Sequence, residues 1–238
     1  IKYLNSNIIG FVNVLECCKE FPVKNFIYAS SSSVYGVNQK LPFIESESAS
    51  YPASLYAATK RSNELIAHSY SHIYNIPCIG LRFFTVYGPW GRPDMAPMIF
   101  TKAIFSGKPI EIFNNGEMSR DFTYIDDVIE ILNRIKDKPP QINKNTGEKY
   151  NYENVLNPYL IFNIGCSQRI KLLRFVEILE EEIGIKAKKI LLPMFSGDVK
   201  DTYSNNRKIS QYTNYEPQIS INEGISRFIK WYKYFHKN

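Results

Sequence analysis

The sequence predicts an α/β protein with a parallel sheet, and two observations carry this prediction. Apolar side chains recur at helical spacing over residues 2–20 and 54–74, and a short run rich in aromatic and β-branched side chains follows each of them, at 25–30 and 78–84. Helix, strand, helix and strand joined by short connections are typical of parallel sheets. The 238 residues are enough for one large domain or two small ones.

From residue 85 onward the pattern becomes irregular, and we expect a smaller α+β lobe that binds the substrate. Residues 87–94 form a loop rich in Gly and Pro, the Asn-Asn-Gly run at 114–116 predicts a hairpin turn, and Asp126 and Asp127 predict the start of a helix. The remaining predicted elements are helices over 95–105, 128–135, 170–184, 206–211 and 222–235, strands over 109–113, 160–164 and 188–192, and a surface linker over 136–158.

Composition is that of an ordinary globular protein. Apolar residues make up 44% and charged residues 22% of the chain, and no apolar run approaches the roughly 18 residues of a membrane span. The net charge of +6 comes from scattered side chains, so no nucleic-acid surface is expected. The four cysteines lack CxxC spacing, which indicates a reducing compartment and predicts a cytoplasmic protein. His68 and His72 share a helix face, but no third ligand supports a metal site.

Tyr56 and Lys60 lie four residues apart on the predicted helix 54–74, so they share one of its faces. A cation close to a phenol favours its ionised form, and an ionised tyrosine can act as a general base. Such pairs also occur by chance, so the neighbouring motifs decide how much weight this one carries.

The serine run Ser30–Ser33 follows the first predicted strand, where open parallel sheets bind ligands. A hydroxyl there could orient a substrate hydroxyl for proton transfer to Tyr56, whereas elsewhere such a run would be a flexible loop.

Three motifs follow one another along the chain, namely Tyr28-Ala-Ser-Ser-Ser-Ser-Val-Tyr-Gly36, Tyr56-xxx-Lys60 and Leu81-Arg-Phe-Phe-Thr-Val-Tyr-Gly-Pro89. Together they resemble the extended short-chain dehydrogenase/reductase family of nucleotide-sugar epimerases and dehydratases. Segments 7–10, 119–127, 197–199 and 215–232 are also similar, so the resemblance covers essentially the whole chain. It implies an incomplete Rossmann-type, doubly wound parallel sheet with a smaller α+β substrate-binding lobe, and NAD as cofactor.

Two features narrow the resemblance. Dehydratases of the dTDP-glucose 4,6 type carry an Asp-Glu pair where this sequence has Ser32 and Ser33, so elimination of water has no evident proton carriers. The run from Phe84 to Ala96 resembles UDP-glucuronate 4-epimerases, in which the positions of Thr85 and Arg92 hold the sugar carboxylate. A guanidinium suits that role because it pairs bidentately with a carboxylate, although Arg92 could also be a surface arginine. UDP-galactose 4-epimerases have Asn in place of this threonine and lack the Trp-Gly-Arg-Pro segment.

The resemblance implies a reversible redox inversion at C4 of a UDP-sugar, with UDP-glucuronate favoured. Tyr56 would take the proton of the 4-hydroxyl, Ser31 would orient O4 with Ser33 as a second candidate, and Lys60 would hold the nicotinamide ribose. Asp121, Asp126 and Asp127 are expected to cap a helix or bind backbone amides. Contacts to NAD are expected from Asn7, Ser30, Tyr56, Lys60 and Phe83, and contacts to the UDP-sugar from Ser32, Thr85, Arg92, Arg120 and Asp198.

The glycine-rich GxxGxxG turn that opens such domains does not occur in these 238 residues. Asn7–Gly10 corresponds to the fourth helix of the family, so we expect about three βα units, on the order of ninety residues, before Ile1. The favoured hypothesis is a fragment of an NAD-dependent UDP-glucuronate 4-epimerase, because loss of three strands would expose an apolar sheet edge. The alternatives are a truncated UDP-sugar-binding protein without redox catalysis, and a decarboxylase or epimerase of another UDP-sugar.

The expected domain organisation follows from the same resemblance. A partial NAD-binding domain is expected over residues 1–84, about 121–136 and 159–165, and a UDP-sugar lobe over about 85–120 and 166–238. Family members commonly pair through the helices that correspond to 2–20 and 54–74, which predicts a homodimer.

Overall fold

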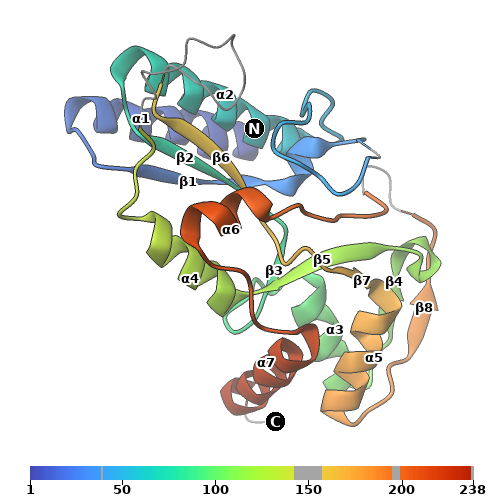
Figure 1. Ribbon diagram of the computed structural model, residues 1–238. Coiled ribbons are helices and arrows are strands. Elements are labelled where there is room, and N and C mark those ends of the chain that lie inside the picture. Colours follow the sequence, from blue (N-terminus) through green and yellow to red (C-terminus); the bar gives the residue numbers. More distant parts are fainter. Residues whose placement is uncertain (39, 142–156, 195–198, 237–238) are drawn as a thin grey trace. The chain divides into compact units, whose positions relative to one another are not determined.

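The first of two compact units is built on a three-stranded parallel sheet (Figure 1). The computed structural model describes residues 1–38, 40–141, 157–194 and 199–236. The strands lie in the order β1 (Phe26–Ser31), β2 (Cys78–Phe83) and β6 (Tyr159–Ile164). In this register Ser31 faces Phe83, so the carboxyl ends of the strands meet at one edge. The predicted α/β class with a parallel sheet is confirmed.

Helices cover both faces of this sheet, with α1 (Gly10–Glu20) and α2 (Leu55–Tyr74) on one face and α6 (Arg207–Thr213) on the other (Figure 1). Helix α2 begins where the Ser54 hydroxyl accepts a hydrogen bond from the Ala57 amide at 3.2 Å, and it ends at Asn75 in a left-handed conformation. The predicted helix 2–20 is present, but a π-helix, Leu4–Ile9, forms its first turns.

A second compact unit comprises Phe84–Ile129, Gly165–Ser204 and Glu216–Asn238. Its first sheet has the order β3 (Thr85–Tyr87), β5 (Ser119–Tyr124) and β7 (Arg169–Lys171), with β3 parallel and β7 antiparallel to β5. A second small sheet pairs β4 (Ile110–Ile112) with β8 (Lys189–Leu191) in parallel. The helices are α3 (Ala96–Phe105), α5 (Leu172–Ile183) and α7 (Ile221–His236).

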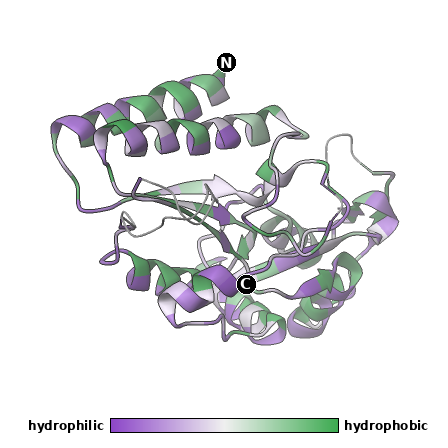
Figure 2. Cartoon of the chain, turned by 45° about the horizontal axis from the view of Figure 1, so that its top comes forward, coloured by the Kyte–Doolittle hydropathy of each residue, from purple (hydrophilic) through white to green (hydrophobic). Residues whose placement is uncertain are grey.

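The core of the second unit is rich in aromatic side chains. The rings of Phe122 and Phe175 stack with their centroids 4.3 Å apart, and Ile225 and Phe228 of α7 are completely buried. Helices α5 and α7 are amphipathic, and apolar and polar stretches alternate along the helices in Figure 2. The first half of α7 is therefore anchored in the core of the second unit.

The units differ from the predicted domain boundaries in two places. The first unit comprises Ile1–Phe83, Glu130–Ile164 and Asn205–Tyr215, so it includes α6, which the sequence analysis assigns to the other lobe. Conversely, residues 121–129 belong to the second unit, because β5 pairs with β3 and β7 rather than with the parallel sheet of the first unit.

Several local predictions need correction. The Asn-Asn-Gly run forms a 3₁₀ turn, Phe113–Gly116, in which Asn114 and Asn115 have φ of 50° and 51°, but it joins no hairpin because β4 pairs with β8. Strands β3, β5 and β7 were not predicted, and the first residues of the predicted helix 170–184 belong to β7. The segment 142–156 of the predicted linker lies outside the described residues.

Helix α4 (Ile125–Ile135) starts one residue before the aspartates that were expected to precede it. Asp126 and Asp127 therefore lie in its first turn, and the Asp127 carboxylate accepts hydrogen bonds from the amides of Gln218 at 2.9 Å and Ile219 at 3.1 Å. The expected binding of backbone amides is confirmed for Asp127. Within the described ranges, no helix is long and apolar enough to cross a membrane.

Candidate active site

Tyr56 and Lys60 lie on the first two turns of α2, beside the carboxyl half of β1. The Lys60 Nζ atom is 6.0 Å from the centroid of the Tyr56 ring and donates a hydrogen bond to the Ala29 carbonyl at 3.1 Å. Partial burial lowers the pKa of Lys60 below its ordinary value. The predicted pair is thus formed, and the ammonium links the helix that carries Tyr56 to the strand that carries the serines.

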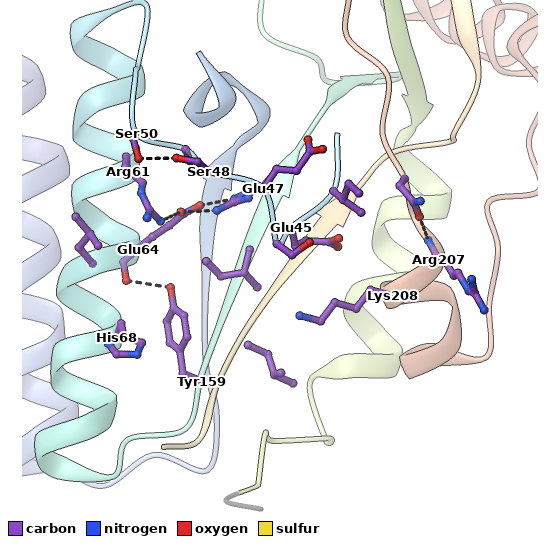
Figure 3. A pocket seen from close by; sticks show the side chains of 18 of the residues that line it. Glu45, Glu47, Ser48, Ser50, Arg61, Glu64, His68, Tyr159, Arg207 and Lys208 are labelled. Atoms are coloured by element: carbon purple, nitrogen blue, oxygen red, sulfur yellow. Dashed lines mark hydrogen bonds and ion pairs between the residues drawn. The ribbon is translucent and has the colours of Figure 1, made fainter. Parts of the chain in front are cut away.

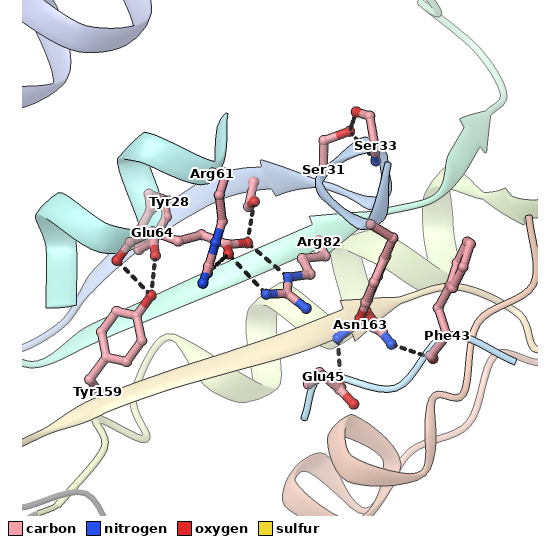
Figure 4. A network of polar contacts seen from close by, with 12 residues as sticks. Tyr28, Ser31, Ser33, Phe43, Glu45, Arg61, Glu64, Arg82, Tyr159 and Asn163 are labelled. Carbon is pink, nitrogen blue, oxygen red and sulfur yellow. Dashed lines mark hydrogen bonds and ion pairs between the residues drawn. The ribbon is translucent and has the colours of Figure 1, made fainter. Parts of the chain in front are cut away.

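The serine run occupies the end of β1 and the 3₁₀ turn Ser32–Tyr35 that follows it. The Ser31 and Ser33 hydroxyls hydrogen-bond each other, and the Ser33 amide donates to Ser31 Oγ at 3.2 Å. Figure 4 shows both side chains together at the end of the strand. Gly36 closes the turn with a φ of 58°, and a side chain there would collide with the Tyr51 backbone. The two serines predicted to orient the sugar hydroxyl are therefore held together.

Ser30 points into the interior, because alternate residues of a strand face opposite sides of the sheet. It is 3% exposed, and its hydroxyl donates to the Glu64 carboxylate of α2 at 2.6 Å. The predicted contact of Ser30 with NAD is not tested, but its hydroxyl already has a buried partner.

Glu64 joins α2 to all three strands of the sheet (Figure 4). Its carboxylate accepts from Arg82 Nε at 2.8 Å and Nη2 at 2.9 Å, and from Arg61 at 2.7 Å, while its backbone carbonyl accepts from the Tyr159 hydroxyl at 2.9 Å. Burial alone raises the pKa of Glu64, but the hydrogen bonds and charge of Arg82 outweigh that effect, so the pKa is lowered. The sequence does not predict this network, and its one signal is an arginine inside an apolar strand.

A second group of polar side chains lies on the other side of Arg82. The Arg82 guanidinium is 4.8 Å from the centroid of the Tyr35 ring, and the Tyr35 hydroxyl donates to Asn163 at 2.7 Å. The Asn163 amide donates to the Glu45 carboxylate at 2.8 Å. Burial raises the pKa of Tyr35 to about 12, which keeps its hydroxyl protonated as a donor.

Asn7 makes hydrogen bonds to α2, the helix that carries Tyr56 and Lys60. Its side-chain amide donates to the Thr59 hydroxyl at 3.0 Å, and its backbone carbonyl accepts from Asn63. The π-helix, Leu4–Ile9, contains this residue. Asn7 is therefore placed to orient α2, and its predicted contact to NAD remains a prediction, as does that of half-buried Phe83 at the end of β2.

A cavity of the first unit measures about 1030 Å³ and lies beside Glu64 and Tyr159 (Figure 3). It is lined by residues 44–50, 159–161, 207 and 208 together with Arg61, Glu64, Leu65, His68, Arg82, Asn205 and Gln211. None of the predicted site residues lines it. The Glu64 carboxylate at this cavity is fully engaged by its hydrogen-bond partners.

In the second unit, Thr85 and Arg120 line one small cavity of about 150 Å³. Thr85 faces Phe122 across the pairing of β3 with β5, so these neighbouring strands bring the two predicted residues together. The Arg120 guanidinium donates to the carbonyls of Ser119 at 2.9 Å and Lys200 at 3.0 Å. Asp198, the other residue predicted to bind the nucleotide, lies outside the described residues.

Arg92 lies in the exposed loop before α3, and its side chain is 71% exposed. Its guanidinium pairs with the Asp94 carboxylate at 3.3 Å and contacts Met95 Sδ at 3.4 Å. An exposed ion pair of this kind contributes little stability, so the guanidinium can exchange it for another carboxylate at small cost.

The fold and the site define a class, namely α/β proteins of Rossmann type with a Tyr-Lys helix beside a strand that ends in serines. A model of the NAD dependent epimerase/dehydratase family matches residues 1–152. Protein CapI of Staphylococcus aureus is 48% identical over 99% of this chain and 71% of that protein, and a probable UDP-glucuronate 4-epimerase of Rhizobium meliloti is 44% identical over 97% and 68%. The chain therefore belongs to the NAD-dependent epimerase/dehydratase family.

A solved structure agrees with this assignment. The crystal structure of UDP-glucuronic acid 4-epimerase from Bacillus cereus in complex with UDP-glucuronic acid and NAD matches with a TM-score of 0.81 at 32% identity. The match covers 98% of this chain and 69% of that one. The family resemblance and the Rossmann-type fold expected from the sequence are confirmed.

Proposed function

We propose that the protein interconverts UDP-glucuronate and UDP-galacturonate by inversion at C4. The observation that carries this proposal is the Tyr56–Lys60 pair on α2 beside the hydroxyl pair of Ser31 and Ser33 at the end of β1. A base, a cation and two hydroxyls at the carboxyl end of a parallel sheet suit deprotonation of an alcohol during its oxidation.

Tyr56 takes the proton from the sugar 4-hydroxyl, and the Ser31 or Ser33 hydroxyl orients O4 toward it. These hydroxyls can each exchange their mutual hydrogen bond for one to the sugar, because a hydroxyl both donates and accepts. Lys60 stabilises the phenolate, since its ammonium lies on the same face of α2. The 4-keto sugar then turns within the site, and Tyr56 returns the proton when the opposite C4 configuration forms.

Bound NAD would supply the acceptor and donor of the hydride for oxidation and reduction at C4. The residues present fit its nicotinamide half, because the Lys60 ammonium has three N–H donors, and within the described ranges it donates one to a protein acceptor, the Ala29 carbonyl. The other two N–H donors of Lys60 suit the hydroxyls of the nicotinamide ribose. Tyr56, Lys60, Asn7, Ser30 and Phe83 are the residues that we propose to surround this half.

Substrate choice rests on the second unit. We propose that Thr85 and Arg92 bind the sugar carboxylate, that Ser32 contacts the sugar, and that Arg120 and Asp198 hold the UDP. The proposal for Arg92 is supported by its exposed guanidinium, whose present partner is a carboxylate. A UDP-sugar with a neutral sugar would offer this arginine no sugar carboxylate to bind.

The decisive variant is Tyr56→Phe, made in the full gene product that contains this chain. It is expected to abolish epimerisation while UDP binding, measured by calorimetry, stays within about twofold of the wild type. Tyr74→Phe, on the exposed end of the same helix, is the matched control and should retain full turnover. Turnover in Tyr56→Phe would rule out the assigned base.

A homodimer through α1, α2 and the preceding π-helix is part of the proposal. These segments expose large apolar side chains, among them Tyr3, Leu4, Ile9, Val14, Leu55, Ile73 and Tyr74. Such a surface on two neighbouring helices suits a second copy of the same helices. Ile73→Lys is expected to yield monomers in sedimentation, whereas Ile129→Lys, an exposed apolar position on α4, should remain dimeric.

A further inference from the structure

The loop that carries Arg92 also carries an exposed tryptophan in a strained conformation. Trp90 has a φ of 61°, in the left-handed region that bulky side chains rarely adopt, and it is 72% exposed. A strained residue persists only where its surroundings stabilise it, so the contacts of this ring identify what holds the loop.

The Trp90 ring contacts two aromatic side chains of α7. Its centroid is 4.7 Å from Phe235 in an edge-to-face arrangement and 5.4 Å from Trp231. Trp231 and Phe235 stack on each other at 5.4 Å with an interplanar angle of 14°. Each of these separations lies within the range at which aromatic pairs attract.

These α7 side chains form one row that starts in the core. Phe228, Trp231 and Phe235 recur at helical spacing on one face of α7, and Phe228 stacks on Trp231 at 5.9 Å. Phe228 is completely buried, whereas Phe235 is 48% exposed. The row therefore connects the rigid core of the second unit to the tip of the loop.

The other contacts of the loop tip are local. Arg92 pairs with Asp94 and contacts Met95, and the Gly91 amide donates to the Gly88 carbonyl at 3.3 Å. In the described part of the chain, the ring contacts of this tip are those of Trp90 with α7. Its position, and with it the position of Arg92, depends on the aromatic row.

We propose that Trp231 and Phe235 are positioning residues for substrate specificity, which hold Trp90 so that Arg92 meets the sugar carboxylate. The inference rests on the proposed function, and it adds the C-terminal helix to the residues that decide which UDP-sugar is bound. Neither aromatic side chain needs to touch the substrate. They act by fixing the loop before the substrate arrives, which lowers the cost of ordering it on binding.

The test compares Phe235→Ala with Tyr234→Ala in the full gene product. Tyr234 is the neighbouring aromatic residue of α7 and is 87% exposed, and no ring contact joins it to the described residues of the row, so it is a matched control. Calorimetry gives the ratio of the dissociation constants for UDP-glucose and UDP-glucuronate, which isolates the contribution of the carboxylate. Phe235→Ala is expected to lower this preference about three- to tenfold through weaker UDP-glucuronate binding, while Tyr234→Ala and Phe235→Tyr retain it.

Tryptophan fluorescence supplies a readout that does not depend on substrate. Both tryptophans of these 238 residues belong to this contact, so a change in their emission reports on it. Phe235→Ala should shift the emission to longer wavelength, with unchanged circular dichroism, and Tyr234→Ala should not.

The outcomes separate the two proposals. A wild type that prefers UDP-glucuronate together with a Phe235→Ala variant that keeps the full preference would overturn the inference and leave the proposed function intact. Equal weakening of both sugars by Phe235→Ala would also overturn it, because the aromatic row would then support the fold rather than Arg92. A wild type without any preference for UDP-glucuronate would overturn the proposed function and the inference with it.

Discussion

Replacing Glu64 by Gln is expected to destabilise the first unit severely. The Glu64 side chain is completely buried and the Arg82 side chain is 3% exposed, with two hydrogen bonds of 2.8 and 2.9 Å between them. Ser30 and Arg61 add two further hydrogen bonds to the same carboxylate. Removing the negative charge leaves a buried guanidinium without its counterion, a change that typically costs about 3–5 kcal/mol.

The cost of leaving Arg82 without its counterion differs from the net contribution of the Glu64–Arg82 pair to stability, and a double variant separates the two. Arg82 Nη1 is buried without a hydrogen-bond partner among the described residues, so the native pair is incompletely satisfied. The double variant Glu64→Leu/Arg82→Met removes both charges and should recover most of the loss, to within about 2 kcal/mol of the wild type. Glu223→Gln breaks the exposed pair with Arg227 and is the control, with an expected loss below about 1 kcal/mol.

The assay is urea unfolding followed by circular dichroism at neutral pH and at pH 4. Because the folded-state pKa of Glu64 is lowered, its contribution is complete above the ordinary value of 4.5 and is lost as the pH falls below it. The difference between the wild type and Glu64→Gln should therefore shrink in acid. A Glu64→Gln variant within about 1 kcal/mol of the wild type at neutral pH would refute the reasoning.

Three further predictions concern the second unit. Burial raises the pKa of Glu180, but hydrogen bonds from Lys186 and Lys189 outweigh this effect and lower the pKa to about 2. In urea titrations, the stability advantage of the wild type over Glu180→Gln should therefore be complete above pH 4.5 and vanish near pH 2. Ser204→Ala removes the hydroxyl that binds the buried Asp121 carboxylate and should cost about 1–3 kcal/mol by urea unfolding, and a loss near zero would contradict the hydrogen bond. Gly224→Ala places a methyl group against the Tyr87 hydroxyl and should cost about 1–3 kcal/mol, visible as a lower thermal midpoint.

The sequence predicted the strand ends, the Tyr-Lys pair and the main helices because their signals are local. The periodicity of 54–74 and its Ser54 cap are properties of neighbouring residues, and the structure places α2 at Leu55–Tyr74. The prediction of a hairpin at the Asn-Asn-Gly turn was wrong, because strand pairing depends on residues distant in the sequence, and β4 pairs with β8. Strand β5 was missed because its buried face includes polar side chains such as Ser119 and Asp121.

The candidate site was predictable only in part, for a related reason. Arg82 within an apolar strand signals that a buried partner exists, since an unpaired buried charge is costly. The sequence offers no way to choose Glu64 over the other acidic residues, because the choice depends on how α2 packs on β1 and β2. The Trp90 contact with α7 likewise joins residues more than a hundred positions apart.

The central claim, inversion by transient oxidation at C4, is tested most directly with UDP-glucuronate that carries deuterium at C4. The full gene product is incubated with this substrate in ordinary water, and the product is examined by NMR. The account predicts UDP-galacturonate that retains the deuterium at C4, because the hydrogen leaves and returns without exchange with solvent. Loss of deuterium from C4, or unchanged substrate, would contradict it.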